Sequence, residues 1–309
     1  MSSNKKKYPF WHLAPHTFIL GAGASRAAFP DGDKHGNQLP LMRDFIDVVG
    51  LKPFLERNSI EIQDGNIETI YSSLVGNNAP EAIIEELNTT ISEYFRCLEI
   101  PDHVTLYDEL ILSLQAKDAI FSFNWDPLLL QAFHRNNNMR KLPRLYFLHG
   151  NVENGICVEH KRVGFIGNVC SVCRKPFQPG RLLYPIKEKD YTSDPYIKGE
   201  WEALRWYVSN SFILSIFGYS APSTDVEAVE ILKKAWTESN EHKRFNEMDI
   251  IDVIDRETMD ENWAEFVYNG HRRRYHSVRD TISFNYARRS CESWGDAILR
   301  SSAWRENNL

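Results

Sequence analysis

The chain has 309 residues, of which 42% are hydrophobic and 25% are charged, and a formal net charge of -6 at pH 7. This composition is that of a globular protein large enough to bury a sizeable core. The acidic balance gives no general attraction to nucleic acid or to an anionic membrane surface. No apolar run approaches the roughly 20 residues that a membrane helix needs.

The first 16 residues are expected to form a disordered tail. The lysines at 5–7 and the Ala22-Gly23-Ala24 stretch superficially resemble a signal peptide and its cleavage site. Prolines and histidines interrupt the apolar run between them, and cleavage there would remove the first predicted strand. The five cysteines also lack the pattern of a secreted disulfide framework. We therefore expect a cytoplasmic protein.

A strand and a glycine turn follow the tail. Residues 17–20 are β-branched, aromatic or aliphatic and uncharged, which predicts a buried strand of a parallel sheet. Gly21 and Gly23 permit a tight turn, and Ala24 and Ser25 would begin a helix whose N–H groups could hold a pyrophosphate. Arg26 stands where the dinucleotide fingerprint has its third glycine, so this motif alone is weak.

Helical spacing dominates the next stretch of the chain. Apolar residues recur every three or four positions in four segments, at 41–49, 67–76, 80–98 and 104–114. Such spacing predicts amphipathic helices. Because they separate the first strand from the next one, we expect a helical insertion at about residues 40–117.

Polar residues follow the next two predicted strands. Asn124 and Asp126 come after residues 119–123, and His149 comes after residues 145–148. Open α/β sheets bind ligands where the carboxyl ends of parallel strands meet, so these three side chains are candidates for a binding or catalytic site. Simpler interpretations stay open. Asn124 and Asp126 could cap the following helix, and His149 could belong to an ordinary turn.

Residues 151–198 have the character of a small zinc-binding module. A C-x2-H pair and a C-x2-C pair supply four thiolate or imidazole ligands, the set that tetrahedral zinc prefers. Buried free thiols beside a surface histidine are the less favoured alternative. The set leaves no obvious open coordination position, so we expect a structural ion. Its predicted ligands are Cys157, His160, Cys170 and Cys173.

The sheet pattern returns after the module. Residues 212–217 and 249–255 predict strands, and Thr224 with Glu227 offers a capping box for the helix between them. Further helices are expected near 261–268 and 286–304. Three arginines at 272–274 most often form a solvated face, with a partner or phosphate contact as the minority alternative. Cys97 and Cys291 lie in predicted helices and are expected to be small core residues.

Taken in order, these motifs resemble those of the sirtuin family, from about residue 17 to residue 255. The shared pattern is G-A-G-A-S at 21–25, N-W-D at 124–126, H-G at 149–150, the paired zinc ligands, G-Y-S at 218–220 and an acid at a strand end. The resemblance implies a Rossmann-like NAD-binding domain made of residues 17–150 and 199–309. It also implies cofactor binding by Gly21, Ala22, Gly23, Ser25, Gly218, Ser220 and Asp255, and catalysis by Asn124, Asp126 and His149.

The sequence also departs from the sirtuin deacylase pattern. Phe123 replaces a glutamine of the family, and Tyr219 replaces a threonine. Residues 28–33 keep only Pro30 and Asp31 of the segment that closes over the cofactor and helps to seat the acyl-lysine. In this respect the chain more closely resembles divergent bacterial sirtuin-like proteins, several of which hydrolyse NAD during antiphage defence.

The resulting expectation is an NAD+ glycohydrolase that converts NAD to nicotinamide and ADP-ribose and carries a structural zinc ion. Two alternatives are an NAD-dependent protein deacylase and a non-catalytic sensor of NAD or ADP-ribose. The altered loop argues against the deacylase, and the presence of both Asn124 and His149 favours an enzyme over the sensor. We also expect a homo-oligomer or a complex with a partner protein.

Overall fold

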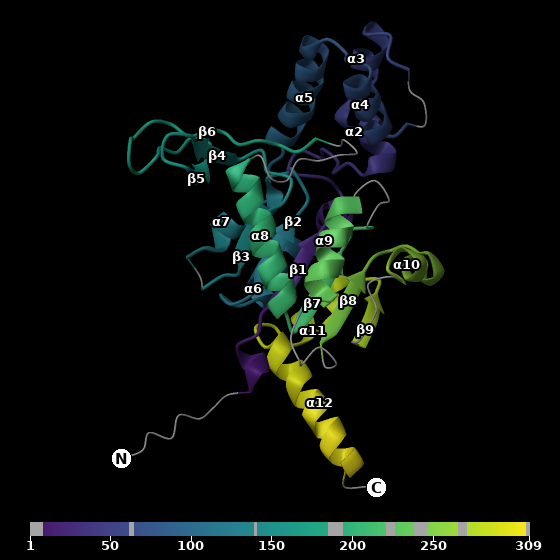
Figure 1. Ribbon diagram of the computed structural model, residues 1–309, viewed down its shortest axis with the longest axis vertical. Coiled ribbons are helices and arrows are strands. Elements are labelled where there is room, and N and C mark those ends of the chain that lie inside the picture. The colour runs from purple at the N-terminus through teal and green to yellow at the C-terminus, as the bar shows by residue number, and fades with distance from the viewer. Residues whose placement is uncertain are drawn as a thin grey trace.

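The computed structural model describes residues 9–61, 65–138, 141–184, 194–220, 226–237, 246–264 and 271–306. A six-stranded parallel sheet in the order β3-β2-β1-β7-β8-β9 lies at their centre (Figure 1). The chain winds outward from β1 twice, once in each direction, which is the Rossmann-like order. The predicted fold class is therefore confirmed. The strands are β1 (His16–Leu20), β2 (Ala119–Ser122), β3 (Arg144–Phe147), β7 (Ile213–Phe217), β8 (Glu247–Ile251) and β9 (His271–Tyr275).

The central strand β1 is buried on both faces, because helices cover both sides of the sheet. Phe18 and Leu20 belong to one hydrophobic cluster, together with α1 (Ala22–Ala28), α6 (Leu106–Ser113) and α7 (Leu128–Asn136). Ile19 points into the other cluster, with α8 (Pro195–Asn210), α9 (Val226–Thr237) and α10 (Arg256–Asn262). The uncharged sequence of this strand follows from that double burial.

The helical insertion forms as the apolar spacing predicts, and in Figure 1 most of it projects above the sheet. One short helix, α3, was not expected from the pattern. The elements before α6 are η2 (Met42–Asp44), α2 (Phe45–Val49), α3 (Lys52–Arg57), α4 (Ile67–Gly76) and α5 (Glu81–Arg96).

The cysteine-containing module is a small antiparallel sheet in the order β5-β4-β6. Its strands are β4 (Asn154–Cys157), β5 (Arg162–Phe165) and β6 (Gln178–Pro179). Tyr184 anchors its base to the helical insertion, because its ring stacks on Tyr71 with 5.6 Å between the centroids. The far end of the module projects away from the sheet (Figure 1).

The chain is ordered from further upstream than the predicted strand. Phe10–His12 form a 3-10 helix (η1), and Phe10 and Trp11 pack against the ring of Phe212. The tail expected at residues 1–16 is therefore structured in its second half, and residues 1–8 lie outside the described part. The C-terminal elements are η5 (Val278–Asp280), α11 (Ile282–Asn285) and α12 (Ser290–Glu306). No described helix is long and apolar enough to span a bilayer.

Several expectations were wrong, most of them for the C-terminal half of the chain. Strand β8 ends at Ile251 instead of continuing to residue 255, and α10 occupies 256–262 instead of 261–268. Residues 265–268 and Thr224, one half of the expected capping box, lie outside the described residues. Cys97 is exposed just after α5, whereas Cys291 is buried as expected.

The arginine run at 272–274 forms an additional strand, β9, instead of a solvated face. Alternate side chains point to opposite faces of a strand, and the ion pairs follow that alternation. Arg273 lies 2.7 Å from the buried Glu247, while Arg272 and Arg274 both pair with Asp260 of α10. The three arginines therefore form ion pairs with acidic side chains of the same chain.

Candidate functional site

The glycine turn after β1 packs directly against the turn after β7. The Gly23 N–H donates to the Gly218 carbonyl at 3.0 Å. A Cβ added to Gly21 would lie 2.7 Å from Tyr219 Cα, and one added to Gly23 would lie 2.8 Å from Gly218 Cα. Gly218 itself has a φ of +61°, in the left-handed region. Close backbone packing is thus sufficient to explain the glycines, whatever the turn binds.

Three residues that the sequence singled out come together at the carboxyl ends of β1 and β2. The Asn124 side-chain amide donates to the Gly21 carbonyl and to Ser25 Oγ, both at 2.9 Å. Ser25 Oγ in turn donates to Asp126 Oδ2 at 2.7 Å. All three side chains are buried or nearly so. We call this group the Ser25–Asn124–Asp126 cluster.

The Asp126 carboxyl group accepts a backbone hydrogen bond and also has a shifted pKa. Its Oδ1 accepts the Leu128 N–H at 3.1 Å, although Pro127, and not Asp126, is the N-cap residue of α7. Burial raises the pKa of Asp126 to about 6, against the opposing effect of the hydrogen bonds from Ser25 and Leu128. The carboxyl group can therefore change its charge near neutral pH.

Tyr107 of α6 completes the cluster and was missed at the sequence level. Its hydroxyl lies 2.7 Å from Ser25 Oγ, and the side chain is 1% exposed. Burial, with the charge of Asp126, raises the pKa of this phenol well above its usual range. The only sequence signal was one polar group on the apolar side of an amphipathic helix, which is a common feature of protein cores.

His149 lies in the turn after β3, next to an aromatic pair. Its ring meets Phe123 edge-on, with 4.8 Å between centroids. Phe123 stacks on Tyr219 at 4.4 Å and an interplanar angle of 10°. Two of the residues that depart from the sirtuin pattern, Phe123 and Tyr219, therefore contact each other. His149 is 7% exposed, and its carbonyl accepts the Leu183 N–H at 2.9 Å.

The last predicted residue of the site, Asp255, lies away from the end of the strand. Its carboxylate caps α10 by accepting the Thr258 N–H at 3.0 Å, and this hydrogen bond lowers the pKa of the exposed acid. The acid that directly follows β8 is Asp252, whose Oδ1 accepts the Val253 N–H at 2.7 Å. Ser220 is exposed after the Gly218 turn. No described hydrogen bond joins Ser220 or Asp255 to the Ser25–Asn124–Asp126 cluster.

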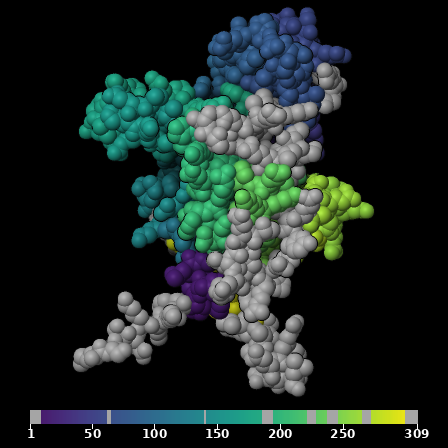
Figure 2. All heavy atoms as spheres, in the orientation of Figure 1, coloured from purple at the N-terminus to yellow at the C-terminus, as the bar shows by residue number. Residues whose placement is uncertain are grey.

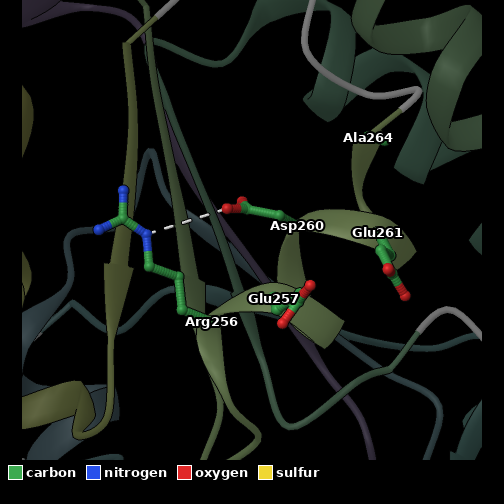
Figure 3. Close-up of a pocket in the computed structure, with 5 residues that line it drawn as sticks. All are labelled: Arg256, Glu257, Asp260, Glu261 and Ala264. Carbon is green, nitrogen blue, oxygen red and sulfur yellow. Dashed lines mark ion pairs between the residues drawn. The ribbon is translucent and has the colours of Figure 1, made fainter.

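A surface cavity of about 480 Å³ lies beside α10 and is drawn in Figure 3. Arg256 and Asp260 approach each other there at 3.9 Å, while the carboxylates of Glu257 and Glu261 point elsewhere. A second cavity of about 600 Å³ lies between β9 and the α11–α12 segment. None of the residues that the sequence assigned to catalysis or to NAD lines either cavity.

The predicted zinc ligands do converge. One donor atom from each of the four residues lies within 4.8 Å of the other three. The Cys157 Sγ is 3.6 Å from His160 Nδ1 and 3.7 Å from Cys173 Sγ. Tetrahedral zinc with its usual bond lengths places neighbouring ligand atoms about 3.6–3.8 Å apart. The residues therefore fit a closed, structural zinc site made by Cys157, His160, Cys170 and Cys173.

No protein-family model matches the sequence, and no curated protein matches it either. Solved sirtuin structures align with most of the chain at low sequence identity. A sirtuin from work on substrate affinity is 15% identical, with 95% of this chain and 99% of that chain covered and a TM-score of 0.42.

Two further structures give similar values. One from work on the mechanism and regulation of Sir2 enzymes is 13% identical, with 92% and 95% of the two chains covered and a TM-score of 0.43. Sir2Tm bound to a propionylated peptide is 15% identical, with 93% and 96% covered and a TM-score of 0.39. Likeness of this extent says nothing about which reaction the present chain catalyses.

Proposed function

We propose that this chain is a sirtuin-like NAD+ glycohydrolase, which cleaves the nicotinamide–ribose bond of NAD with water. The observation that carries the proposal is the Ser25–Asn124–Asp126 cluster at the carboxyl ends of two adjacent central strands. This is the edge where open α/β sheets bind ligands. The cluster supplies an amide, a hydroxyl and a carboxyl group with a pKa near neutrality, and His149 follows the next strand of the sheet.

In this proposal the glycine turns bind the cofactor backbone. Gly21, Ala22, Gly23 and Ser25 would hold the pyrophosphate at the start of α1, with Gly218 and Ser220 on the facing turn. The exposed Asp255 carboxylate would accept hydrogen bonds from the adenosine ribose. A structural zinc ion would hold the module together without taking part in the reaction, because its four protein ligands complete a tetrahedron.

The proposed chemistry needs little more than positioning and one proton acceptor. Water attacks the anomeric carbon of the ribose, and nicotinamide leaves with the electrons of the glycosidic bond as a neutral base. The water loses its proton to His149, and ADP-ribose remains. Asn124 and Asp126 would orient the ribose and the water, and a carboxylate beside the sugar would stabilise its developing positive charge.

The stacked pair of Phe123 and Tyr219 supports hydrolysis over deacylation. Both rings are buried, and they place apolar surface next to His149, where the deacylase pattern has two polar side chains. The antiphage setting of this reaction is part of the same proposal and rests on the sequence resemblance alone. In that setting, depletion of NAD would be the effect on the host cell.

The test is to incubate the purified chain with NAD, with and without an acetylated peptide, and to separate the products. Nicotinamide and ADP-ribose should appear in equal amounts without the peptide. His149→Ala should lower turnover by ~10²–10⁴-fold, the usual contribution of a positioned acid–base group. Asn124→Ala should also lower turnover, because it removes the amide that would orient the ribose and the water. His103→Ala, at an exposed position, is the matched control and should leave turnover unchanged.

Other outcomes point to the alternatives. Release of nicotinamide only when the peptide is present, together with an acyl-ADP-ribose product, would identify a deacylase. Tight NAD binding without turnover under all conditions would identify a sensor. Turnover that survives the loss of His149 would refute the assigned role of that residue.

A further inference from the structure

The strand that leads to His149 has a backbone N–H group at its open edge. Strand β3 is the last strand on its side of the sheet, and the Leu148 N–H donates to the Ser122 carbonyl of β2 at 2.9 Å. Successive N–H groups of a strand point to opposite sides, so the Phe147 N–H points away from β2. Phe147 is buried, and a buried donor needs an acceptor from outside the sheet.

Glu200 of α8 supplies this acceptor. Its Oε2 accepts the Phe147 N–H at 2.6 Å. The next residue of the helix, Trp201, is fully buried, and its indole N–H donates to the Leu148 carbonyl at 3.0 Å. Two consecutive side chains of α8 therefore hold the two consecutive residues that precede His149.

The turn that contains His149 closes on the residue that Glu200 holds. The Gly150 N–H donates to the Phe147 carbonyl at 3.1 Å, so Phe147 is bonded to α8 through its N–H and to the turn through its carbonyl. Gly150 has a φ of +79°, in the left-handed region that glycine adopts readily. His149 lies inside this turn, so the position of its ring depends on where Phe147 is held.

The same helix also contacts the chain after the turn. The Asn154 side-chain amide, at the start of β4, donates to the Tyr196 hydroxyl at 2.6 Å. Tyr196 precedes Glu200 by one helical turn, so the two side chains lie on the same side of α8. In the space-filling view the exposed side of α8 lies next to the projecting module (Figure 2). α8 therefore holds the chain on both sides of His149, at Phe147 before it and at Asn154 after it.

The carboxyl group of Glu200 is in an unfavourable place for a charge. Burial raises the pKa of Glu200 to about 7, against the opposing effect of the hydrogen bonds from the Phe147 N–H and the Tyr196 hydroxyl. An apolar side chain would avoid this desolvation cost but would leave the Phe147 N–H without its acceptor. The hydrogen bond to Phe147 is therefore what this side chain contributes to the fold.

We propose that Glu200 is a positioning residue, which sets the place of His149 by holding the Phe147 N–H. This inference rests on the proposed function, in which His149 accepts the proton of the attacking water. Glu200 acts through the backbone of β3 and exchanges no proton with the substrate. Displacement of a catalytic group by ~1 Å can lower turnover by ~10²-fold, so a single hydrogen bond at this place can control the rate.

The kinetics of NAD hydrolysis test the proposal with three variants. Glu200→Ala should lower kcat by ~10²-fold with little change in KM, because the residues that would bind NAD stay in place. Glu200→Gln should retain most of the wild-type kcat, since its side-chain carbonyl oxygen still accepts the Phe147 N–H. Glu202→Ala, at an exposed glutamate of the same helix, is the matched control and should behave as wild type.

A second readout does not depend on turnover. The NMR signals of the His149 imidazole, assigned by their loss in His149→Ala, should shift in Glu200→Ala, and the Gly150 amide should exchange faster with solvent. Glu200→Gln and Glu202→Ala should resemble the wild type in both measurements. Thermal unfolding establishes that each variant is folded. If Glu200→Ala does not fold, Glu200→Met takes its place, because it keeps the length of the side chain and offers only a weak acceptor.

The outcomes separate this proposal from the proposed function. Unchanged His149 signals in Glu200→Ala would overturn the positioning role, as would equal losses of kcat in Glu200→Ala and Glu200→Gln. Shifted His149 signals in a chain that releases no nicotinamide would refute the glycohydrolase and still support the hold of Glu200 on His149.

Discussion

The hydroxyl of Tyr107 lies 2.7 Å from Ser25 Oγ, and Ser25 donates its own proton to Asp126. Tyr107 belongs to α6, at the end of the helical insertion, whereas Ser25 and Asp126 flank the central strands. A phenol that donates to a hydroxyl strengthens the next hydrogen bond in the chain. The insertion is thereby connected to the charge state of the proposed catalytic carboxyl group.

Replacement of Tyr107 tests this connection. Tyr107→Phe should raise the pKa of Asp126, because Ser25 becomes a weaker donor to the carboxylate. The acidic limb of the pH–rate profile for NAD hydrolysis should therefore move to higher pH, with kcat changing more than KM. The free energy of unfolding should fall by ~0.5–1.5 kcal/mol, the usual contribution of one buried hydrogen bond.

Tyr71→Phe is the matched control for Tyr107, since it removes another phenol that donates to a side chain, Asn88 Oδ1, at 2.8 Å. It should lose comparable stability without any change in the pH–rate profile. Identical pH–rate profiles for both variants and the wild type would mean that Tyr107 only packs.

Removal of the metal should affect the module and leave the sheet folded. Structural zinc sites supply folding free energy directly, so chelation should disorder residues 151–184 and expose them to proteolysis. Cys173→Ser should have the same effect, because it removes one ligand. Cys97→Ser, at an exposed thiol outside the site, should change nothing. A folded chain that contains clearly less than one zinc ion would contradict the assignment.

The buried acids of β8 predict an unusual dependence of stability on pH. Burial raises the pKa of Glu247 to about 8 and that of Asp249 to about 7, against the attraction of Arg273. The folded state then binds more protons than the unfolded state between pH ~4 and ~8, so stability falls as pH rises through this window. His16, whose pKa burial lowers to about 3, acts in the opposite direction, but only below pH ~6.5.

The free energy of unfolding should therefore decline between pH 6.5 and 8.5, when followed by denaturant titration at each pH. Glu247→Gln removes one titrating group. It should therefore reduce the slope of the free energy of unfolding against pH by up to ~1.4 kcal/mol per pH unit, the value for one proton. Glu85→Gln, on the exposed face of α5, should leave the slope unchanged. A slope that does not differ between wild type and Glu247→Gln would refute this account of the buried acid.

The close packing of the two glycine turns predicts that a single added methyl group, at Gly218, strongly lowers the stability of the fold. Gly218 has a φ of +61°, and an added Cβ would collide with the backbone of Gly23 and Ala24. Gly36 has a φ of +83° with no atom within 4 Å of the added Cβ. Gly36→Ala should cost ~1–2 kcal/mol from backbone strain alone. Gly218→Ala should cost ~1–3 kcal/mol more, from overpacking.

Chemical denaturation measures both variants, and equal losses of stability would contradict the packing argument. Substitutions at Gly21 or Gly23 are poor tests of cofactor binding for the same reason, because they disturb the turn itself.

The sequence predicts the central strands well because burial on both faces leaves them without charge. It also predicts that Ser25, Asn124 and Asp126 lie near one another, because each follows the end of a recognisable strand and the two strands are neighbours in the sheet. Tyr107 could not be found in this way. Its role depends on the approach of α6 to α1, which no local pattern encodes.

The errors after β8 have equally specific causes. Apolar residues continue through Val253 and Ile254, so the sequence pattern does not mark the end of the strand at Ile251. The strand ends in a turn that Asp252 forms by accepting the Val253 and Ile254 N–H groups. Strand β9 was missed because it contains no aliphatic residue. Its arginines pair with Glu247 and Asp260, which are 26 and 12 residues or more away in sequence.

The arginines of β9 have a further consequence for the behaviour of the chain in a crowded solution. β9 and β3 are the two outermost strands of the sheet, and an unpaired strand edge is a template for aggregation with other chains. Arg272 and Arg274 hold guanidinium groups over one face of β9, and Arg144 is exposed at the start of β3. Charged side chains at both borders disfavour the addition of a foreign strand, so the ion pairs that join β9 to α10 should also make edge-to-edge pairing of two chains less favourable.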